Sequence, residues 1–212
     1  TMREELDLAR EAADMATFAA NLCGSGNHPR LVVPTPIAGV VGERVLVMTF
    51  VEGVSVDDGD ALRAAGHDLE ELLRIGIRAW IDSAFVHGLF HGDMHAGNVF
   101  VTPSGDVAFL DFGIMGRLSP RTRDVLLRLL PAVMLDQRDY AAVLGALAEL
   151  GGVDAPLDVA RAVADIEQLV APLVERPLGE VVYSEVLDAL LQVAGAHRIR
   201  LPRELVAIVK QL

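Results

Sequence analysis

The chain has 212 residues, of which 52% are hydrophobic and 23% are charged, a composition typical of one globular domain or two small lobes rather than of a disordered protein. Its 18 basic and 30 acidic residues give a formal net charge of −12, which argues against a nucleic-acid partner and against simple electrostatic docking to anionic lipid. The single cysteine excludes an internal disulfide and fits a reducing, cytoplasmic compartment.

The mean hydropathy of +0.39 is high, yet no apolar run reaches the roughly 18 residues that a membrane span needs. The longest candidate, residues 72–90, is interrupted by charged side chains. The hydropathy therefore predicts buried helices, or a surface that a missing segment or a membrane-associated partner covers. Helical patterns run to both ends of the chain without a start or stop pattern, so we expect a fragment of a longer protein.

Residues 3–22 are predicted to form a helix, because apolar residues recur there at spacings of three and four. Carboxylates follow the same spacing along another face of that helix. They are Glu4, Asp7, Glu11 and Asp14. Like charges at these spacings destabilise a helix by about 0.2–0.5 kcal/mol per pair. The pattern leaves two interpretations open: a solvated acidic face, or carboxylates that meet a cation elsewhere, such as a lysine or magnesium.

Residues 35–41 and 44–50 are predicted to be two strands, and the second is apolar at nearly every position, as a buried strand would be. Residues 51–54 form either a plain linker or, in a two-lobed kinase, the hinge that reads an adenine edge. Asp68 is placed to cap the next helix, which carries a wide apolar stripe over residues 69–85. Trp80 in that stripe is predicted to be a core residue.

The richest chemistry lies in residues 90–113. Asp93 and Asn98 stand five residues apart in a glycine-containing loop, and Asp111 follows thirteen residues later. That spacing predicts one hairpin, with strands at 99–101 and 107–110 and a turn at 103–105. The hairpin brings the three side chains together, as phosphoryl transfer requires. A carboxylate and an amide oxygen hold magnesium on the nucleotide phosphates, and a separate carboxylate faces the acceptor.

Two other interpretations of this segment are weaker. One is an ordinary hairpin with polar loop residues. The other is a metal site made by His87, His91 and His95, which would share one face of a continuous helix. Glycines interrupt that run and a strand follows at once, which favours the loop.

The remainder is predicted to be helical. Ser119 and Pro120 begin a helix that runs to residue 134, with Pro131 expected to bend or divide it. Further helices are expected at 139–150, 157–173 and 184–194, and from residue 202 onward. The predicted fold class is therefore α+β and mostly helical.

The chain resembles the UbiB family of atypical protein-kinase-like proteins, also called aarF-domain-containing kinases. Glu5-Leu6-Asp7 followed by Glu11-Ala12 is similar to the family's ExD signature at the start of its helix C. Residues 44–53 resemble its second strand and hinge, and residues 91–98 with 111–118 resemble its catalytic loop and metal segment. The resemblance covers nearly the whole chain.

The resemblance implies a protein-kinase-like fold, with a truncated small lobe at 1–53 and a helical large lobe at 54–212. It implies that Asp93 is the catalytic-loop aspartate, that Asn98 and Asp111 hold magnesium, and that Glu11 pairs with the nucleotide lysine. It also assigns residues to the cofactor site and its cover. These are Glu5 and Asp7 in the ExD element, Met48 as gatekeeper, and Phe50 and Val51 at the hinge.

By the same resemblance we expect an ATP-binding, magnesium-dependent kinase or ATPase linked to isoprenoid quinone or lipid metabolism. Its partners would be a nucleotide and a membrane-associated lipid or quinone-pathway component at the cytoplasmic face of the membrane. Two alternatives stay open: a phosphotransferase like the aminoglycoside and choline kinases, and a non-catalytic pseudokinase module.

The sequence departs from the family pattern at several positions. The family usually has alanine at Gly92, prolines at Met94 and Ala96, and glutamate at Thr49. The nucleotide-binding lysine is also missing, since Lys210 is the only lysine in the chain. We therefore expect the chain by itself to be a poor catalyst.

Overall fold

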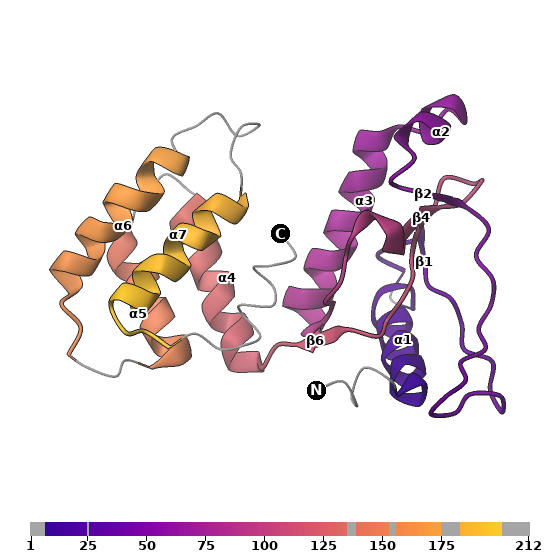
Figure 1. Cartoon of the computed structure of the whole chain (residues 1–212), viewed down its shortest axis with the longest axis horizontal. Coiled ribbons are helices and arrows are strands. Elements are labelled where there is room, and N and C mark those ends of the chain that lie inside the picture. The colour runs from indigo at the N-terminus through magenta and orange to yellow at the C-terminus, as the bar shows by residue number, and fades with distance from the viewer. Residues whose placement is uncertain (1–6, 25, 135–138, 153–155, 175–182, 201–212) are drawn as a thin grey trace. The chain divides into compact units, whose positions relative to one another are not determined.

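The computed structural model describes residues 7–24, 26–134, 139–152, 156–174 and 183–200. It forms two compact units, Thr1–Arg117 and Leu118–Leu212 (Figure 1). The first unit combines helices with two small sheets, and the second is built from helices. The predicted α+β, mostly helical class is confirmed. The predicted lobe boundary at residue 53 stays a prediction.

The first helix, α1, spans Leu8–Leu22. Asp7 caps it, because its Oδ1 accepts hydrogen bonds from the backbone N–H groups of Ala9 and Arg10, each at 3.1 Å. Its buried face carries Ala12, Asp14, Met15, Phe18 and Leu22. The apolar periodicity therefore predicted the helix correctly, and the part of the prediction before residue 7 lies outside the described residues.

A four-stranded sheet has the order β1-β5-β4-β2. Its strands are β1 (Leu31–Val32), β2 (Val54–Ser55), β4 (Val99–Val101) and β5 (Val107–Phe109). β4 and β5 form the predicted antiparallel hairpin, and β1 pairs in parallel with β5. Gly105 has a φ of +85° in the turn, a conformation that glycine adopts without steric cost. The sequence prediction of this hairpin is confirmed, with the return strand one residue shorter.

The two segments at 35–41 and 44–50 differ from their prediction. They run antiparallel, with Ile37 N donating to Val47 O at 2.8 Å and Thr49 N donating to Thr35 O at 3.0 Å. Only isolated bridges form, and Val45 is 56% exposed. The prediction of a buried second strand is wrong, because no strand in the described part of the chain lies against these segments to cover them.

Two helices follow β2. The short α2 spans Gly59–Ala64, and α3 spans Leu69–Asp82 with the predicted cap, since Asp68 Oδ1 accepts from Glu70 N at 3.0 Å. A π-helical turn at Ser83–His87 extends α3 and ends at Gly88, whose φ is +70°. α3 buries Leu72, Gly76, Ala79 and Trp80, whereas Leu73, Ile77 and Ile81 are exposed. The buried stripe is thus narrower than predicted, and Trp80 is in the core as expected.

A second sheet pairs β3 (Leu89–His91) with β6 (Met115–Arg117) in antiparallel fashion. Phe90 lies opposite Gly116, and a Cβ atom at Gly116 would overlap the Phe90 ring. Glycine is therefore required at this position. This pairing joins the strand before the catalytic loop to the segment after Asp111, and the sequence did not predict it.

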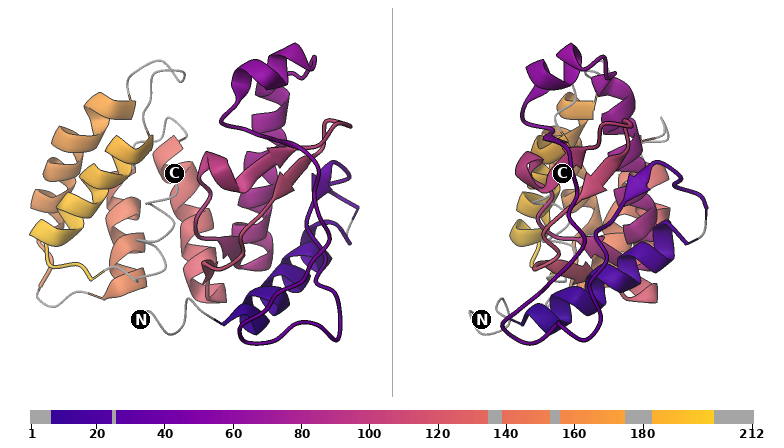
Figure 2. Two further views of the ribbon diagram at one scale, coloured as in Figure 1. Left: turned by 45° about the vertical axis from the view of Figure 1, so that its right-hand side comes forward. Right: turned by 90° about the vertical axis from the view of Figure 1, so that its right-hand side faces the viewer.

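In the second unit, α4 spans Pro120–Met134, α5 spans Tyr140–Gly151, α6 spans Val159–Val174 and α7 spans Tyr183–Ala196. Ser119 caps α4, accepting from Thr122 N at 3.0 Å, and Asp139 caps α5. α4 runs through Pro131 without dividing. α5 packs against α4 and α6, and α6 against α7 (Figure 2). The helix predicted from residue 202 lies outside the described residues.

None of the helices in the described ranges is both long and apolar enough to cross a membrane.

Candidate active site

The predicted catalytic loop leaves β3 at His91 and closes with a 3-10 turn at Ala96–Asn98. Asn98 N donates to His95 O at 2.9 Å within that turn. Gly92 N donates to Ile114 O at 2.7 Å, which ties the loop to the segment after Asp111. A Cβ atom at Gly92 would stand 3.0 Å from Ile114, so the alanine usual in the family would need a small shift here.

His91 holds the two ends of the motif together. Its ring is fully buried, Nδ1 accepts from Asp93 N at 3.2 Å, and Nε2 faces Leu110 O at 2.9 Å. A carbonyl can only accept, so Nε2 carries the proton and the imidazole is neutral. Burial lowers the pKa of His91 below its ordinary value, and interactions with Leu110, Asp111 and Asp93 partly oppose that shift. With both nitrogens bonded in this way, His91 is a structural residue and not a metal ligand.

Asn98 is oriented by the loop itself. Its Nδ2 donates to Asp93 O at 2.9 Å, which leaves the side-chain oxygen as the group that can bind a cation. Leu110 N donates to Asn98 O at 2.9 Å, so Asn98 and the residue before Asp111 are joined across the mouth of the hairpin.

Asp111 stands at that mouth with a φ of +56°. Aspartate tolerates this left-handed conformation better than most residues, yet it still costs about 1–3 kcal/mol. The turn lets Asp111 Oδ1 accept from Gly113 N at 3.2 Å, and the residue remains exposed. An exposed carboxylate held in a strained backbone is a suitable metal ligand.

Glu11 reaches this point from α1. An ideal Cβ atom built on Gly113 would lie 3.8 Å from Glu11 Oε2 and 3.2 Å from Asp111 Oδ1. The two carboxylates therefore approach the same point. Partial burial raises the pKa of Glu11, the negative charge of Asp111 raises it further, and a hydrogen bond from the Phe112 backbone partly opposes both. Two neighbouring carboxylates without a compensating charge favour a cation between them, either a divalent metal ion or a lysine.

The donor set fits magnesium rather than a metal bound by protein groups alone. Within the described ranges, no three His, Cys, Asp or Glu side chains gather to hold a metal ion. Asp111 and Asn98 supply a carboxylate and an amide oxygen. Magnesium in nucleotide enzymes is held by one or two carboxylates together with the phosphates.

The structure therefore brings four predicted site residues together: Asp93, Asn98, Asp111 and Glu11. The others lie elsewhere or outside the described residues. Asp7 serves as the helix cap, Met48 is 39% exposed, Phe50 is 92% exposed and Val51 is half-buried. Glu5 lies outside the described residues. Their assignment to the cofactor site stays a prediction.

Two features near the site escaped the sequence analysis. His95 Nε2 stands 3.9 Å from Asp93 Oδ2, beside the predicted catalytic carboxylate. Asp14 is buried and paired with Arg117, so one of the α1 carboxylates does meet a cation, although the cation is an arginine. The i, i+3 spacing of Glu11 and Asp14 was visible in the sequence, but nothing local indicated Arg117.

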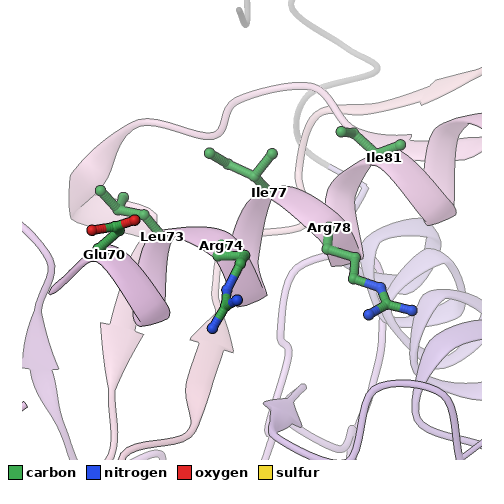
Figure 3. Close-up of a pocket in the computed structure, with 6 residues that line it drawn as sticks. All are labelled: Glu70, Leu73, Arg74, Ile77, Arg78 and Ile81. Carbon is green, nitrogen blue, oxygen red and sulfur yellow. The ribbon is translucent and has the colours of Figure 1, made fainter. Parts of the chain in front are cut away.

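A shallow groove on α3 is separate from this chemistry (Figure 3). The isoleucines and Leu73 project to one side of the helix, and Arg74 and Arg78 to another (Figure 3). The groove is lined by Glu70, Leu73, Arg74, Ile77, Arg78 and Ile81. None of the catalytic-loop or metal-segment residues contributes to it.

Comparison with known proteins identifies the family of the chain. The model of the ABC1 atypical kinase-like domain matches residues 1–146, more than half of the chain. The chain belongs to the ABC1 atypical kinase-like family. The model of the UbiB helical domain matches residues 166–212. The family resemblance predicted from the motifs is confirmed.

Relatives of this ABC1 chain include "Uncharacterized protein Rv0647c" of Mycobacterium tuberculosis, 39% identical over 99% of the chain and 43% of the relative. "Probable protein kinase UbiB" of Azotobacter vinelandii is 34% identical over the whole chain and 39% of the relative. The chain thus spans less than half the length of these curated relatives.

Among solved structures, the complex of Rv3197 with erythromycin from Mycobacterium tuberculosis matches with a TM-score of 0.59 and 24% identity, over 99% of this chain and 52% of that one. This similarity supports the fold.

Proposed function

We propose that the protein containing this chain is an ATP-binding, magnesium-dependent phosphotransferase or ATPase of the UbiB type. The observation that carries the proposal is the mouth of the β4–β5 hairpin. There the Asn98 side-chain amide donates to the backbone carbonyl of Asp93, and the backbone N–H of Leu110, the residue before Asp111, donates to Asn98 O. This is the arrangement of groups that phosphoryl transfer uses.

Each group has a distinct role in this proposal. Asp111 and the Asn98 side-chain oxygen would hold magnesium, which neutralises charge on the nucleotide phosphates when it is bound. Asp93, two residues after the end of β3, faces the acceptor. It accepts the proton of an acceptor hydroxyl or of a water molecule as the terminal phosphoryl group moves to that oxygen and ADP departs. Glu11 orients a cation beside Asp111.

The metabolic setting is a proposal of its own. Relatives at 33–34% identity carry the name "Probable protein kinase UbiB". Together with the family resemblance, this supports a place in isoprenoid quinone or lipid metabolism, with an acceptor or partner at the cytoplasmic face of a membrane. A nucleotide and a membrane-associated lipid or quinone-pathway component are the partners we propose.

The proposal is tested with the full-length protein and ATP labelled at the γ-phosphate, with magnesium present. We expect release or transfer of label, lost in Asp93→Asn, with nucleotide binding retained. Nucleotide binding without turnover in any lipid or detergent condition would favour the pseudokinase alternative. Transfer to an aminoglycoside or to choline would favour the small-molecule kinase alternative.

A further inference from the structure

Asp14 is a buried carboxylate in the first unit. Its side chain is only 8% exposed, and it lies on α1 one turn after Glu11. Burial of a carboxylate is unfavourable unless a positive group and hydrogen bonds compensate for the lost water. Arg117 Nη2 donates to Asp14 Oδ1, and Arg10 Nε stands 3.9 Å from Asp14 Oδ2. The pair with Arg117 is therefore the principal compensation for this charge.

Arg117 stands at a junction of the candidate site. It is the last residue of β6, six residues after Asp111, and it lies opposite Leu89 at the start of β3. β3 ends at His91, where the catalytic loop begins. The guanidinium group thus projects from a segment whose backbone is bonded to the strand before the catalytic loop. Its contact with Asp14 therefore connects α1 to β6 and, through β6, to β3.

The contacts of α1 with the segment 111–117 share one face of the helix. Glu11 Oε2 lies 3.8 Å from an ideal Cβ position at Gly113, and the Phe18 ring packs edge-on against the Phe112 ring with centroids 5.3 Å apart. Asp14 lies between these two positions at spacings of three and four. Apolar ring packing is non-directional and tolerates sliding of a helix. The Arg117 side chain is 59% exposed, but the Asp14 carboxylate that it meets is buried, and a buried carboxylate keeps its partner only in one register.

We propose that Asp14 and Arg117 are positioning residues for phosphoryl transfer. Their ion pair fixes the register of α1 against the segment 111–117, and so holds the Glu11 carboxylate beside Asp111. Neither residue touches the reacting atoms. The inference rests on the proposed function, but the positioning itself can be measured without activity.

The test uses the full-length protein and the variants Arg117→Gln, Arg117→Lys and the double variant Asp14→Asn/Arg117→Gln. The matched control is His28→Gln. His28 Nε2 lies 2.9 Å from Asp82 Oδ2, so this control also removes the imidazole from a partly buried side-chain pair, one that joins the loop after α1 to α3. Calorimetric titration with magnesium and a non-hydrolysable ATP analogue gives Kd. Hydrogen exchange of peptides covering 8–14 and 110–115 reports on the position of α1.

We expect Arg117→Gln to raise Kd by about three- to tenfold, as coupled contacts of this kind do, and to speed amide exchange in both peptides. Arg117→Lys keeps the charge and should recover most of the affinity. His28→Gln should lower Tm while leaving Kd and exchange at 110–115 unchanged. Should Arg117→Gln fail to fold, the double variant, which leaves no buried charge unpaired, takes its place with the same expected changes.

The inference is overturned if Arg117→Gln, or the double variant in its place, lowers Tm as the control does but changes neither Kd nor exchange at 110–115. The pair would then only stabilise the fold. If the unmodified protein binds no nucleotide, the proposed function is wrong. The exchange measurement then decides the positioning role by itself, with faster exchange specific to the Arg117 variants supporting it and equal exchange refuting it.

Discussion

His91 accepts a hydrogen bond from the backbone of Asp93 through Nδ1 at 3.2 Å, and its opposite nitrogen faces Leu110 O at 2.9 Å. One neutral ring therefore sets the distance between the loop aspartate and the residue before Asp111. A protonated ring would present an N–H to the N–H of Asp93 and lose that bond.

The first prediction concerns pH. Because the folded-state pKa of His91 is lowered, the unfolded chain binds the proton more readily than the folded one. The contribution of His91 to stability is fully present above its ordinary pKa of about 6.5 and is lost as pH falls below that value. Urea unfolding at pH 7.5, 6.5 and 5.5 should show falling stability. His91→Gln, which can keep both hydrogen bonds, should show a smaller fall, and an equal fall in both proteins would contradict the prediction.

The second prediction separates the two carboxylates of the proposed mechanism. Asp111→Asn removes charge from the metal ligand, so it should weaken magnesium-nucleotide binding as well as turnover in the full-length protein. Asp93→Asn should lower turnover by about 10²–10⁴-fold with little change in nucleotide affinity, because a positioned base acts mainly in the transition state. Calorimetry beside turnover measures both. The reverse pattern would exchange the two roles.

The third prediction is that the Glu11 carboxylate lowers the free energy of unfolding, although the proposed function requires it. The pKa of Glu11 is raised, so its charged form is disfavoured in the folded state above that pKa, and the effect is absent below the unfolded value of about 4.5. Without magnesium, Glu11→Gln should stabilise the chain at pH 7, by less than about 1 kcal/mol because solvent screens a half-exposed pair. Thermal unfolding measures the effect.

A matched measurement completes this test. Magnesium and nucleotide should stabilise the unmodified full-length protein more than the Glu11→Gln variant, because a bound cation relieves the repulsion from Asp111. A variant that is less stable than the unmodified chain without magnesium would show that Glu11 is instead a net stabilising residue through its bond to Phe112.

The fourth prediction contrasts two glycines. A Cβ atom at Gly76 in α3 would meet Phe109 and Val107 at an ordinary 3.7 Å, so Gly76→Ala should stabilise the protein by about 0.5–1 kcal/mol through helix propensity. At Gly116 the same change overlaps Phe90 across the β3–β6 pair, and we expect severe destabilisation or no folded protein. Denaturant midpoints for the two variants check the contrast, and a stable Gly116→Ala variant would contradict the β3–β6 register.

The fifth prediction concerns the 212-residue chain by itself. In the described part of the chain no basic side chain pairs with Glu11, and Lys210 is the only lysine in the sequence. Magnesium-nucleotide binding should therefore be weak and turnover absent, because a lysine that holds the phosphates is lacking. ATP hydrolysis by the pure chain, abolished in Asp111→Asn, would show that the phosphates are held by other groups.

Much of the local structure could be predicted from sequence. The helix at α1, the cap at Asp68 and the turn at Gly105 each depend on residues within a few positions of one another. Their hydrogen bonds close over short distances along the chain, so residue spacing determines them. The placement of Asp93, Asn98 and Asp111 was predictable for the same reason. A short loop joins the first two, and a hairpin of fixed length joins the last two.

Tertiary structure decided what those elements contact. The partner of Asp14 lies 103 residues away, and the β3–β6 pair joins segments that no turn connects directly. Burial was decided in the same way: His91 is enclosed while Val45 and Ile77 are exposed, although all three lie in apolar stretches. The sequence determined which side chains share a face. Which face is covered depends on packing between distant segments, and so only the folded chain could decide it.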